Sequence, residues 1–222
     1  MVVDPAPFDR SLTVAVLGGT GEQGRGLARR FALGGLRVVL GSRDAARAGT
    51  AAAGLPVGVT GTDNAGAAAQ GDVVVVAVPW DGHRALLVGL AGPLGGKVVV
   101  DCVNPLGFDK QGAFALSVEE GSAAQQAAAV LPDSRVVAAF HHVSAVLLLD
   151  ERVDRLDSDV LVLGDDRGAT ELVQSLVAVV PGMRGVYAGR LRNAHQVEAL
   201  TANLISVNRR YKAHAGLRVT DV

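Results

Sequence analysis

Short runs of valine and other apolar residues recur along the chain, and alanine-rich stretches of helical length separate them. Six of these runs predict strands, at residues 13–18, 37–42, 72–79, 97–102, 135–140 and 159–164. Because they are apolar at nearly every position, they are typical of strands buried on both faces. The stretches at 25–33, 45–53, 82–90 and 122–131 predict helices. This alternation predicts an α/β fold of the Rossmann type, with a doubly wound, mostly parallel sheet.

The pattern changes near residue 190, where apolar residues follow a helical spacing. They are Leu191, Ala194, Val197, Leu200, Leu204 and Val207. This stripe predicts one long amphipathic helix that forms a lid or a dimer contact. No long linker is visible, so we expect a Rossmann domain over residues 12–188 and a small C-terminal helical segment over 189–222. The stretch 104–114 is interpreted as a loop that leaves the carboxyl end of a strand, where α/β folds bind ligands.

Composition and charge narrow the class of protein. With 222 residues, 49% of them hydrophobic, the chain suffices for one large domain with a substantial core. The formal net charge of −1 gives no reason to expect a nucleic-acid partner. Cys102 is the only cysteine, which excludes an intramolecular disulfide and favours a reducing compartment. The first ten residues lack the apolar segment of a secretory signal and the longest apolar runs are short, so we expect a cytoplasmic protein without a membrane partner.

A glycine motif follows the first predicted strand. Gly19, Gly21 and Gly24 form G-x-G-x-x-G at the start of the first predicted helix. In that context the first glycine permits a tight turn, the second lets a pyrophosphate approach the backbone, and the third lets helix and strand pack closely. The anion then lies at the N-terminus of the helix. The motif therefore predicts dinucleotide binding, with a purely structural glycine turn as the alternative.

The end of the second predicted strand selects the dinucleotide. Sites that prefer NAD usually place an acidic residue there for the ribose 2′-hydroxyl, whereas this strand ends in Gly41, Ser42 and Arg43. Arg43 is placed to meet a 2′-phosphate, with Ser42 as a hydrogen-bond donor and Arg47 one helical turn later. These residues favour NADP. Asp44 keeps an alternative open, because it can serve as the acidic residue or as a helix cap while the two arginines are solvated.

Two further strand ends carry candidate residues. The stretch 77–80 ends the strand beside which the nicotinamide half of a dinucleotide usually passes, and Pro79 and Trp80 stand there, Trp80 either as a ligand contact or as a packing residue. His141 and His142 follow another strand, but they lack the spacing of a metal site, and no metal is expected. No nucleophile with its base can be assembled either. The chemistry is therefore expected to belong to cofactors.

These motifs together resemble a known family. The stretches "VAVLGGTGEQGRGLARRFALGG", "VVLGSR", "VPW", the histidine after "RVVAAF", "GDD" at 164–166 and "NAHQVEALTANLISVNRRYKAHAG" are similar to the NADP-dependent reductases of coenzyme F420, an 8-hydroxy-5-deazaflavin hydride carrier. The resemblance extends over nearly the whole chain from residue 12. It implies hydride transfer between C4 of the nicotinamide of NADP(H) and C5 of the deazaflavin, in a homodimer.

The resemblance also implies roles for individual residues. The pyrophosphate is cradled by Thr20, Gly21, Glu22 and Gln23, and the 2′-phosphate by Ser42, Arg43 and Arg47. The nicotinamide region is bordered by Val78 and Ala145. His141 and Val143 border the two rings, and His141 orients or polarises them rather than acting as an essential base.

Several alternatives stay open at this point. The same fold serves NADPH-dependent reductases of a flavin or of a small organic substrate, and it also suits an NADP-sensing module without turnover. Basic residues near the C-terminus either receive the acidic tail of the deazaflavin or form an ordinary solvated surface; they are Arg190, Arg192, Arg209, Arg210, Lys212 and Arg218. No role is assigned to His83, His142 or His195.

Overall fold

A computed structural model describes residues 6–222 and contains an eight-stranded sheet in the order β10-β9-β8-β5-β4-β1-β2-β3. The strands are β1 (Thr13–Leu17), β2 (Arg37–Ser42), β3 (Val59–Asp63), β4 (Val73–Val76), β5 (Val98–Asp101), β8 (Arg135–Ala138), β9 (Ser158–Gly164) and β10 (Met183–Gly189). Neighbouring strands are parallel except β8 and β9, which pair antiparallel. The predicted Rossmann-type α/β fold with a mostly parallel sheet is confirmed.

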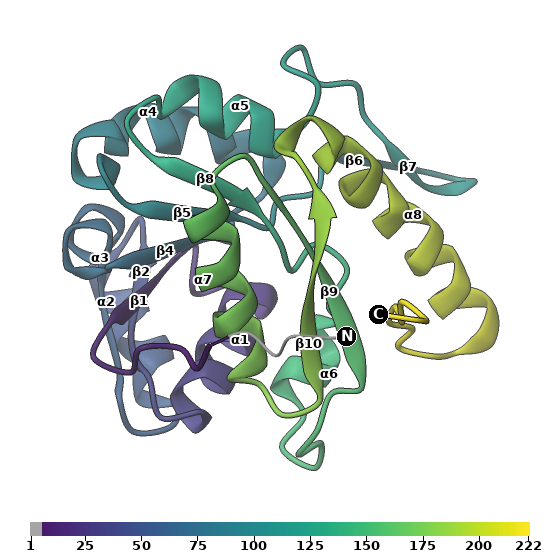
Figure 1. Cartoon of the computed structure of the whole chain (residues 1–222). Helices are drawn as coiled ribbons and strands as arrows, with labels where there is room; N and C mark the ends of the chain where they lie inside the picture. The colour runs from purple at the N-terminus through teal and green to yellow at the C-terminus, as the bar shows by residue number, and fades with distance from the viewer. Residues whose placement is uncertain (1–5) are drawn as a thin grey trace.

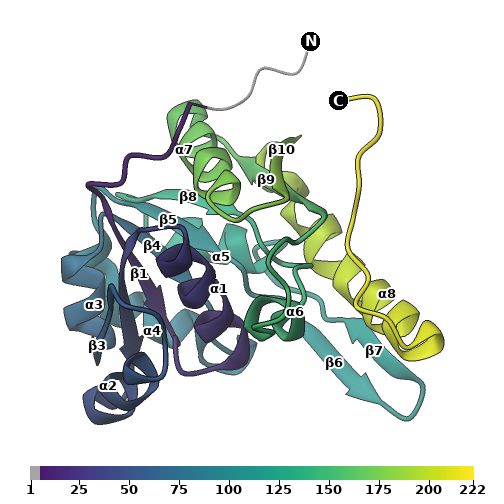
Figure 2. The same cartoon turned by 90° about the horizontal axis from the view of Figure 1, so that it is seen from below.

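Helices cover both faces of the sheet (Figure 1 and Figure 2). They are α1 (Glu22–Leu33), α2 (Ala45–Ala53), α3 (Asn64–Gln70), α4 (His83–Leu94), α5 (Ala123–Val130), α6 (Ala145–Leu149), α7 (Arg167–Ala178) and α8 (Ala194–Tyr211). One apolar core packs α1, α6 and α7 against the sheet, and a second packs α3, α4, α5 and the start of α8 against its other face. The central strands are buried from both sides, which explains their continuous apolar sequences.

The C-terminal half of α8 leaves the body of the molecule beside an antiparallel hairpin of β6 (Leu106–Asp109) and β7 (Gly112–Ala115) (Figure 2). This hairpin occupies the stretch predicted as a loop: the chain does leave the carboxyl end of β5 there, but it folds back on itself. After α8 the chain returns to the sheet, where Asp159 N donates to Leu217 O at 2.8 Å. None of the described helices has the length and hydrophobicity needed to cross a membrane. Part of the N-terminal stretch, predicted to carry no signal segment, lies outside the described residues.

The predicted element boundaries differ from the structure in a few places. Helix α1 begins at Glu22, three residues before the predicted start, because it continues directly from the glycine turn. Strands β3 and β10 and helices α3, α6 and α7 were not predicted. For the two strands the sequence explains the difference. Strand β3 has the sequence VTGTD and β10 has the sequence MRGVYAG, so neither has the apolar run typical of the central strands.

Candidate functional site

The glycine turn connects β1 to α1, and two of its glycines are required by packing alone. A Cβ atom at Gly19 would lie 2.6 Å from Leu40 Cδ2, and one at Gly24 would lie 2.8 Å from Gly19 Cα. A Cβ at Gly21 would meet nothing closer than the carbonyl oxygen of Gly18, at 3.5 Å. Gly19 and Gly24 therefore keep strand and helix close together, while Gly21 leaves its outer side open to a ligand.

The N-terminus of α1 has no side-chain cap. Gly21 is the N-cap residue, and within residues 6–222 no side chain accepts a hydrogen bond from the first turn of this twelve-residue helix. The side chain of Glu22 is exposed, and that of Gln23 donates from Nε2 to the carbonyl oxygen of Phe140 at 3.3 Å. The amide groups of the first turn are thus available to an anion, as the motif predicts. Thr20 is partly buried beside them.

Directly after β2 stands Asp44, the acidic residue on which the alternative to NADP rests. Its Oδ1 accepts hydrogen bonds from the amides of Ala46 at 2.8 Å and Arg47 at 3.2 Å, so Asp44 caps α2. Ser42 is buried at the end of β2, and the side chains of Arg43 and Arg47 are exposed. Within residues 6–222 these two guanidinium groups enter no ion pair. They are therefore free to meet a phosphate.

The end of β4 lies directly against the glycine turn. A Cβ on Gly18 would lie 2.6 Å from both Ala77 O and Val78 Cγ1. Pro79 is exposed and precedes the short 3₁₀ helix η1 (Trp80–Gly82). The Trp80 indole stacks on the His83 imidazole, with ring centroids 5.6 Å apart. Trp80 thus has a packing role, and its contact with the nicotinamide stays a prediction together with those of Val78 and Pro79.

The segment after β8 turns sharply at Phe140, which has a φ of 65°. A positive φ is unusual for a bulky residue and is tolerated only where packing holds it. The Phe140 ring is fully buried, edge-on to Phe31, and its carbonyl accepts the hydrogen bond from Gln23. The turn places His141 and Val143 in buried positions and starts α6 at Ala145. The loops after β1, β4 and β8 therefore meet at one edge of the sheet.

A buried arginine fixes α6 against α1. The Arg30 guanidinium donates to the carbonyls of Leu147 at 2.6 Å, Leu148 at 2.8 Å, Asp150 at 3.0 Å and Val153 at 2.6 Å. The two helices approach so closely that a Cβ at Gly26 would lie 2.6 Å from Leu148 Cβ. Arg30 therefore satisfies carbonyls at the end of α6 and sets the position of Ala145 relative to the glycine turn.

A cluster of ionisable side chains that sequence reasoning did not identify lies behind this edge. The fully buried His83 contacts Asp101 Oδ2 through Nε2 at 2.6 Å and Gln126 Oε1 through Nδ1 at 3.1 Å. Burial lowers the pKa of His83, but the Asp101 carboxylate and the hydrogen bonds outweigh burial and raise it overall. Glu198 of α8 is also buried. Two signals pointed to this cluster: Asp101 ends an otherwise apolar strand, and Glu198 stands four residues after Ala194 on the apolar stripe.

The adjacent histidines are buried and neutral. Burial lowers the pKa of both His141 and His142 to about 4. His142 Nε2 accepts a hydrogen bond from the Leu161 amide at 3.4 Å. The His141 imidazole has no exposed surface, so its predicted contact with the bound rings stays a prediction. His195 is exposed on α8.

The predicted basic residues near the C-terminus do not form one patch. Arg190 lies 4.0 Å from Asp165, before the start of α8, whereas Arg209 and Arg210 occupy its last turn. An 18-residue helix is about 27 Å long, which separates these groups. Arg218 pairs with the buried Asp159 at 2.8 Å. A single binding surface for an acidic tail is therefore not formed by these residues together.

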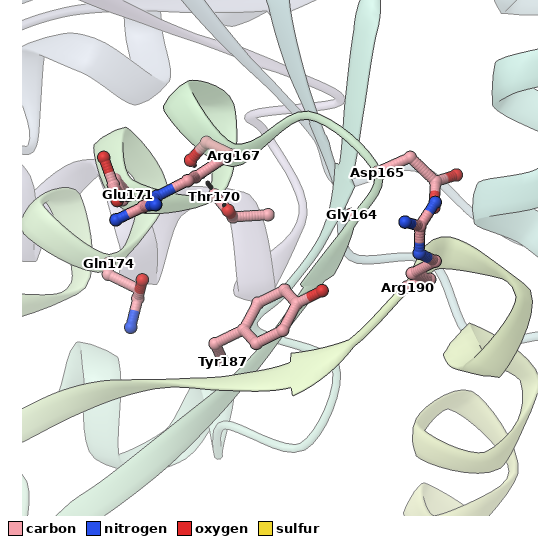
Figure 3. Close-up of a pocket in the computed structure, with 8 residues that line it drawn as sticks. All are labelled: Gly164, Asp165, Arg167, Thr170, Glu171, Gln174, Tyr187 and Arg190. Atoms are coloured by element: carbon pink, nitrogen blue, oxygen red, sulfur yellow. Dashed lines mark hydrogen bonds and ion pairs between the residues drawn. The ribbon is translucent and has the colours of Figure 1, made fainter.

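A cavity of about 410 Å³ lies between α7, β9 and β10 (Figure 3). Its lining includes Gly164, Asp165, Tyr187 and Arg190. None of the described residues that line it belongs to the glycine turn or to the loop after β8. The cavity is therefore separate from the edge where the glycine turn and His141 meet.

Comparison of the sequence with known proteins identifies a family. Residues 13–105 match the family model described as NADP oxidoreductase, coenzyme F420-dependent. The chain is 38% identical to the F420-dependent NADP reductase of Methanothermobacter thermautotrophicus, over 95% of this chain and 96% of that protein. The chain belongs to the F420-dependent NADP reductase family. The resemblance stated from the motifs is thereby confirmed.

Solved structures agree with this family membership. A structure described as a putative F420-dependent NADP reductase from an Arthrobacter species has a TM-score of 0.82 at 27% identity, and the match covers 94% of this chain and 99% of that one. An imine reductase from Bacillus cereus shares the fold, with a TM-score of 0.65 at 19% identity over 90% of this chain and 62% of that one. The family's fold is thus shared by other reductases.

Proposed function

We propose that this member of the F420-dependent NADP reductase family transfers a hydride between NADP(H) and coenzyme F420. Family membership over nearly the full length supports the pair of reactants. The observation that carries the proposal for this chain is the arrangement after β1 and β2: an uncapped helix N-terminus, an open Gly21, and two exposed arginines whose neighbour Asp44 is engaged in a helix cap.

The residues at this edge fit NADP. The amides at the start of α1, with Thr20, Glu22 and Gln23 around them, would hold the pyrophosphate, and Ser42, Arg43 and Arg47 would hold the 2′-phosphate. The free amides at a helix N-terminus also explain how an anion binds beside Glu22, because its exposed side chain can extend into solvent.

The protein's contribution to the chemistry is proximity and orientation. The nicotinamide supplies the hydride at C4 and the deazaflavin accepts it at C5, so both reacting atoms belong to the bound molecules. Val78, Val143 and Ala145 provide an apolar border that positions the rings and limits access of water. Cys102 is not a competing nucleophile, because it is buried, and burial raises the pKa of its thiol.

A spectrophotometric assay tests the proposal. Purified protein is mixed with NADPH and F420, and the visible absorbance of the oxidised deazaflavin is followed, with FMN and FAD as alternative acceptors and NADH as the alternative donor. We expect loss of the deazaflavin absorbance with NADPH and little change with either flavin. Reduction of a flavin alone would support the flavin-reductase alternative, and tight NADPH binding without any acceptor would support a sensing module.

We also propose that the protein acts as a homodimer through the hairpin β6–β7 and the C-terminal half of α8. Four apolar side chains are exposed there: Phe108, Phe114, Val207 and Tyr211. The Phe108 and Tyr211 side chains are 70% and 73% exposed, although the two elements lie side by side (Figure 2). Exposed aromatic residues on two neighbouring elements of a protruding unit favour a partner surface of the same kind. We also propose a cytoplasmic location, which the single cysteine suggests.

A further inference from the structure

Glu198 is buried in an unusual position for a carboxyl group. It belongs to α8, and its Oε2 and Oε1 accept hydrogen bonds from the amides of Ala123 at 2.9 Å and Ala124 at 3.1 Å. Only 2% of the residue is exposed. These two bonds join α8 to the N-terminus of α5, and they fix the carboxyl group close to the loop that follows β8.

His141 lies next to this carboxyl group without a hydrogen-bond partner of its own. Its Nε2 is 4.0 Å from Glu198 Oε1, and within the described part of the chain neither ring nitrogen has a partner. A buried N–H group without an acceptor is costly. The carbonyl of His141 is held by Asn104 at 2.9 Å and Thr201 at 3.3 Å, so its backbone is fixed, and a small rotation of the two side chains would close the gap.

The other charged groups around this pair balance one another. Asp101 and His83 form their own ion pair at 2.6 Å. His142 follows His141 in the chain and is neutral because of burial, and Asp159, whose charge acts on His142, pairs with Arg184 at 2.7 Å. Within the described residues, Glu198 and His141 are therefore the two members of the cluster that form no ion pair closer than their mutual 4.0 Å contact.

We propose that Glu198 is a positioning residue for hydride transfer, which shares one proton with His141 and thereby sets the tautomer of that imidazole behind the bound rings. The inference rests on the proposed function. When Glu198 is protonated, its O–H donates to His141 Nε2, and the imidazole proton is on Nδ1. When Glu198 is ionised, Nε2 carries the proton and donates to the carboxylate.

The two forms differ by one negative charge, and this difference matters to the reaction. In reduction of F420 the C4–H bond of NADPH breaks, its electron pair forms the C5–H bond of the deazaflavin, and the nicotinamide is oxidised to a cation. The reduced deazaflavin gains negative charge until it takes a proton from water. An ionised Glu198 opposes the negative charge that arrives on the deazaflavin but favours the cation left on the nicotinamide. In the proposal His141 lies against the deazaflavin, so the first effect is the larger and the protonated form favours reduction of F420.

Glu198 changes from its protonated to its ionised form within the physiological pH range. Burial raises the pKa of Glu198 to about 7, against the effect of the two amide donors, and burial keeps His141 neutral. A single ionisation near 7 changes the protonated fraction of Glu198 about tenfold between pH 6 and 8.

The test compares pH profiles of single-turnover hydride transfer from NADPH to F420 in the wild type and in Glu198→Gln. The glutamine keeps an oxygen acceptor for the Ala123 amide and an N–H donor for His141, it removes the acceptor of the Ala124 amide, and it has no ionisable proton. We expect the wild-type rate to fall about tenfold from pH 6 to 8 relative to the variant, whose rate stays close to the low-pH value. Ionisation of the deazaflavin hydroxyl affects both proteins alike, so the difference between the profiles isolates Glu198.

Two comparisons separate this role from a structural one. Glu171→Gln removes an exposed carboxylate on α7 that pairs with Arg167, and it should leave the profile unchanged. In a His141→Asn background, Glu198→Gln should have no further effect on the profile, because Glu198 acts through His141. Parallel profiles in the wild type and Glu198→Gln, or an undiminished effect of Glu198→Gln in the His141→Asn background, would overturn the inference.

A measurement on the wild type without bound ligands covers the case in which Glu198→Gln does not fold. The side-chain carboxyl carbon of Glu198 and the ring nitrogens of His141 are followed by NMR as the pH is changed. We expect the chemical shifts of the carboxyl carbon and of the ring nitrogens to change together near pH 7. A carboxyl carbon whose chemical shift is already that of a fully ionised group at pH 6 would overturn the inference. If the wild type transfers no hydride, the proposed function itself is contradicted. If the wild type transfers hydride normally and the pH profile of Glu198→Gln is the same as that of the wild type, only the role of Glu198 is contradicted.

Discussion

At the scale of single residues, the structure distinguishes side chains that the sequence leaves equivalent. Asp44 and Arg43 are neighbours, but Asp44 is committed to the amides of α2 while Arg43 extends into solvent. His142 and His195 differ in the same way, since His142 is buried with Nε2 accepting a backbone hydrogen bond and His195 is exposed. These differences give two predictions at this scale.

Replacing Arg43 with alanine tests the choice of dinucleotide. We expect Arg43→Ala to weaken NADPH binding by about 1–3 kcal/mol, because a charge-assisted contact with the 2′-phosphate is lost, and to leave NADH binding almost unchanged. Calorimetric titration with both nucleotides measures this. Arg167→Ala, which removes an exposed arginine on α7, serves as the control. Equal losses for NADPH and NADH in Arg43→Ala would contradict the assignment.

Replacing His142 with glutamine tests the cost of its burial. The pKa of His142 is lowered to about 4, so the unfolded chain binds a proton that the folded protein resists, and stability falls as pH decreases from 6.5 toward 4. Between pH 7 and 5 this costs about 2 kcal/mol. We expect His142→Gln to reduce the acid-induced loss of unfolding free energy by about that amount, measured by urea unfolding at the two pH values.

His195→Gln provides the matched control, because it removes an exposed histidine from α8. Its pH dependence should follow that of the wild type. An acid-induced loss as large in His142→Gln as in the wild type would show that His142 is not the source of the sensitivity.

At the scale of elements, packing contacts decide where each helix and loop lies. The sequence predicts a helix after the glycine turn, but the contact of Gly24 with Gly19 places α1 against β1. Arg30 then places α6 against α1, and Glu198 places α8 against α5. These contacts join residues that are far apart in the sequence, so spacing alone does not reveal them.

The glycine turn offers a test that separates packing from ligand binding. Gly24→Ala should lower the unfolding free energy by about 1–3 kcal/mol, because its Cβ meets the backbone of Gly19. Gly21→Ala should change stability by less than about 0.5 kcal/mol, since its Cβ has room in the free protein. It should nevertheless weaken NADPH binding more than about tenfold, a loss of about 1.4 kcal/mol, because that Cβ lies where the pyrophosphate approaches.

Chemical denaturation and NADPH titration of both variants give the comparison. If Gly21→Ala binds NADPH as well as the wild type does, the pyrophosphate does not pass over Gly21, and the proposed position of the cofactor is wrong.

At the scale of the whole molecule, the hairpin and α8 extend from an otherwise closed α/β body (Figure 1). The first half of α8 is packed against the second core, whereas Val207 and Tyr211 near its end are exposed. The first part of the predicted apolar stripe therefore packs within the chain. We propose that a second copy of the chain covers its last part.

The double variant Phe108→Ser with Tyr211→Ser tests this assembly. We expect a wild-type dimer and a variant monomer in sedimentation velocity, because the two most exposed aromatic side chains of the surface are removed. Val57→Ser is the control, since Val57 is fully exposed between α2 and β3. A monomeric wild type would contradict the dimer proposal.

The sequence by itself determined the fold class, the cofactor motif and the family. Strands buried on both faces must be apolar throughout, and a pyrophosphate turn needs glycine at fixed spacing, so both leave local patterns that a single sequence displays. Edge strand β3, hairpin β6–β7 and the turn at Phe140 left no such pattern. Only the tertiary structure decided that Asp44 caps α2 and that Arg30 donates to the carbonyls at the end of α6. It alone also brought together Asp101, His83, Glu198 and His141. Burial and charge pairing depend on residues distant in the chain, and only folding brings these together.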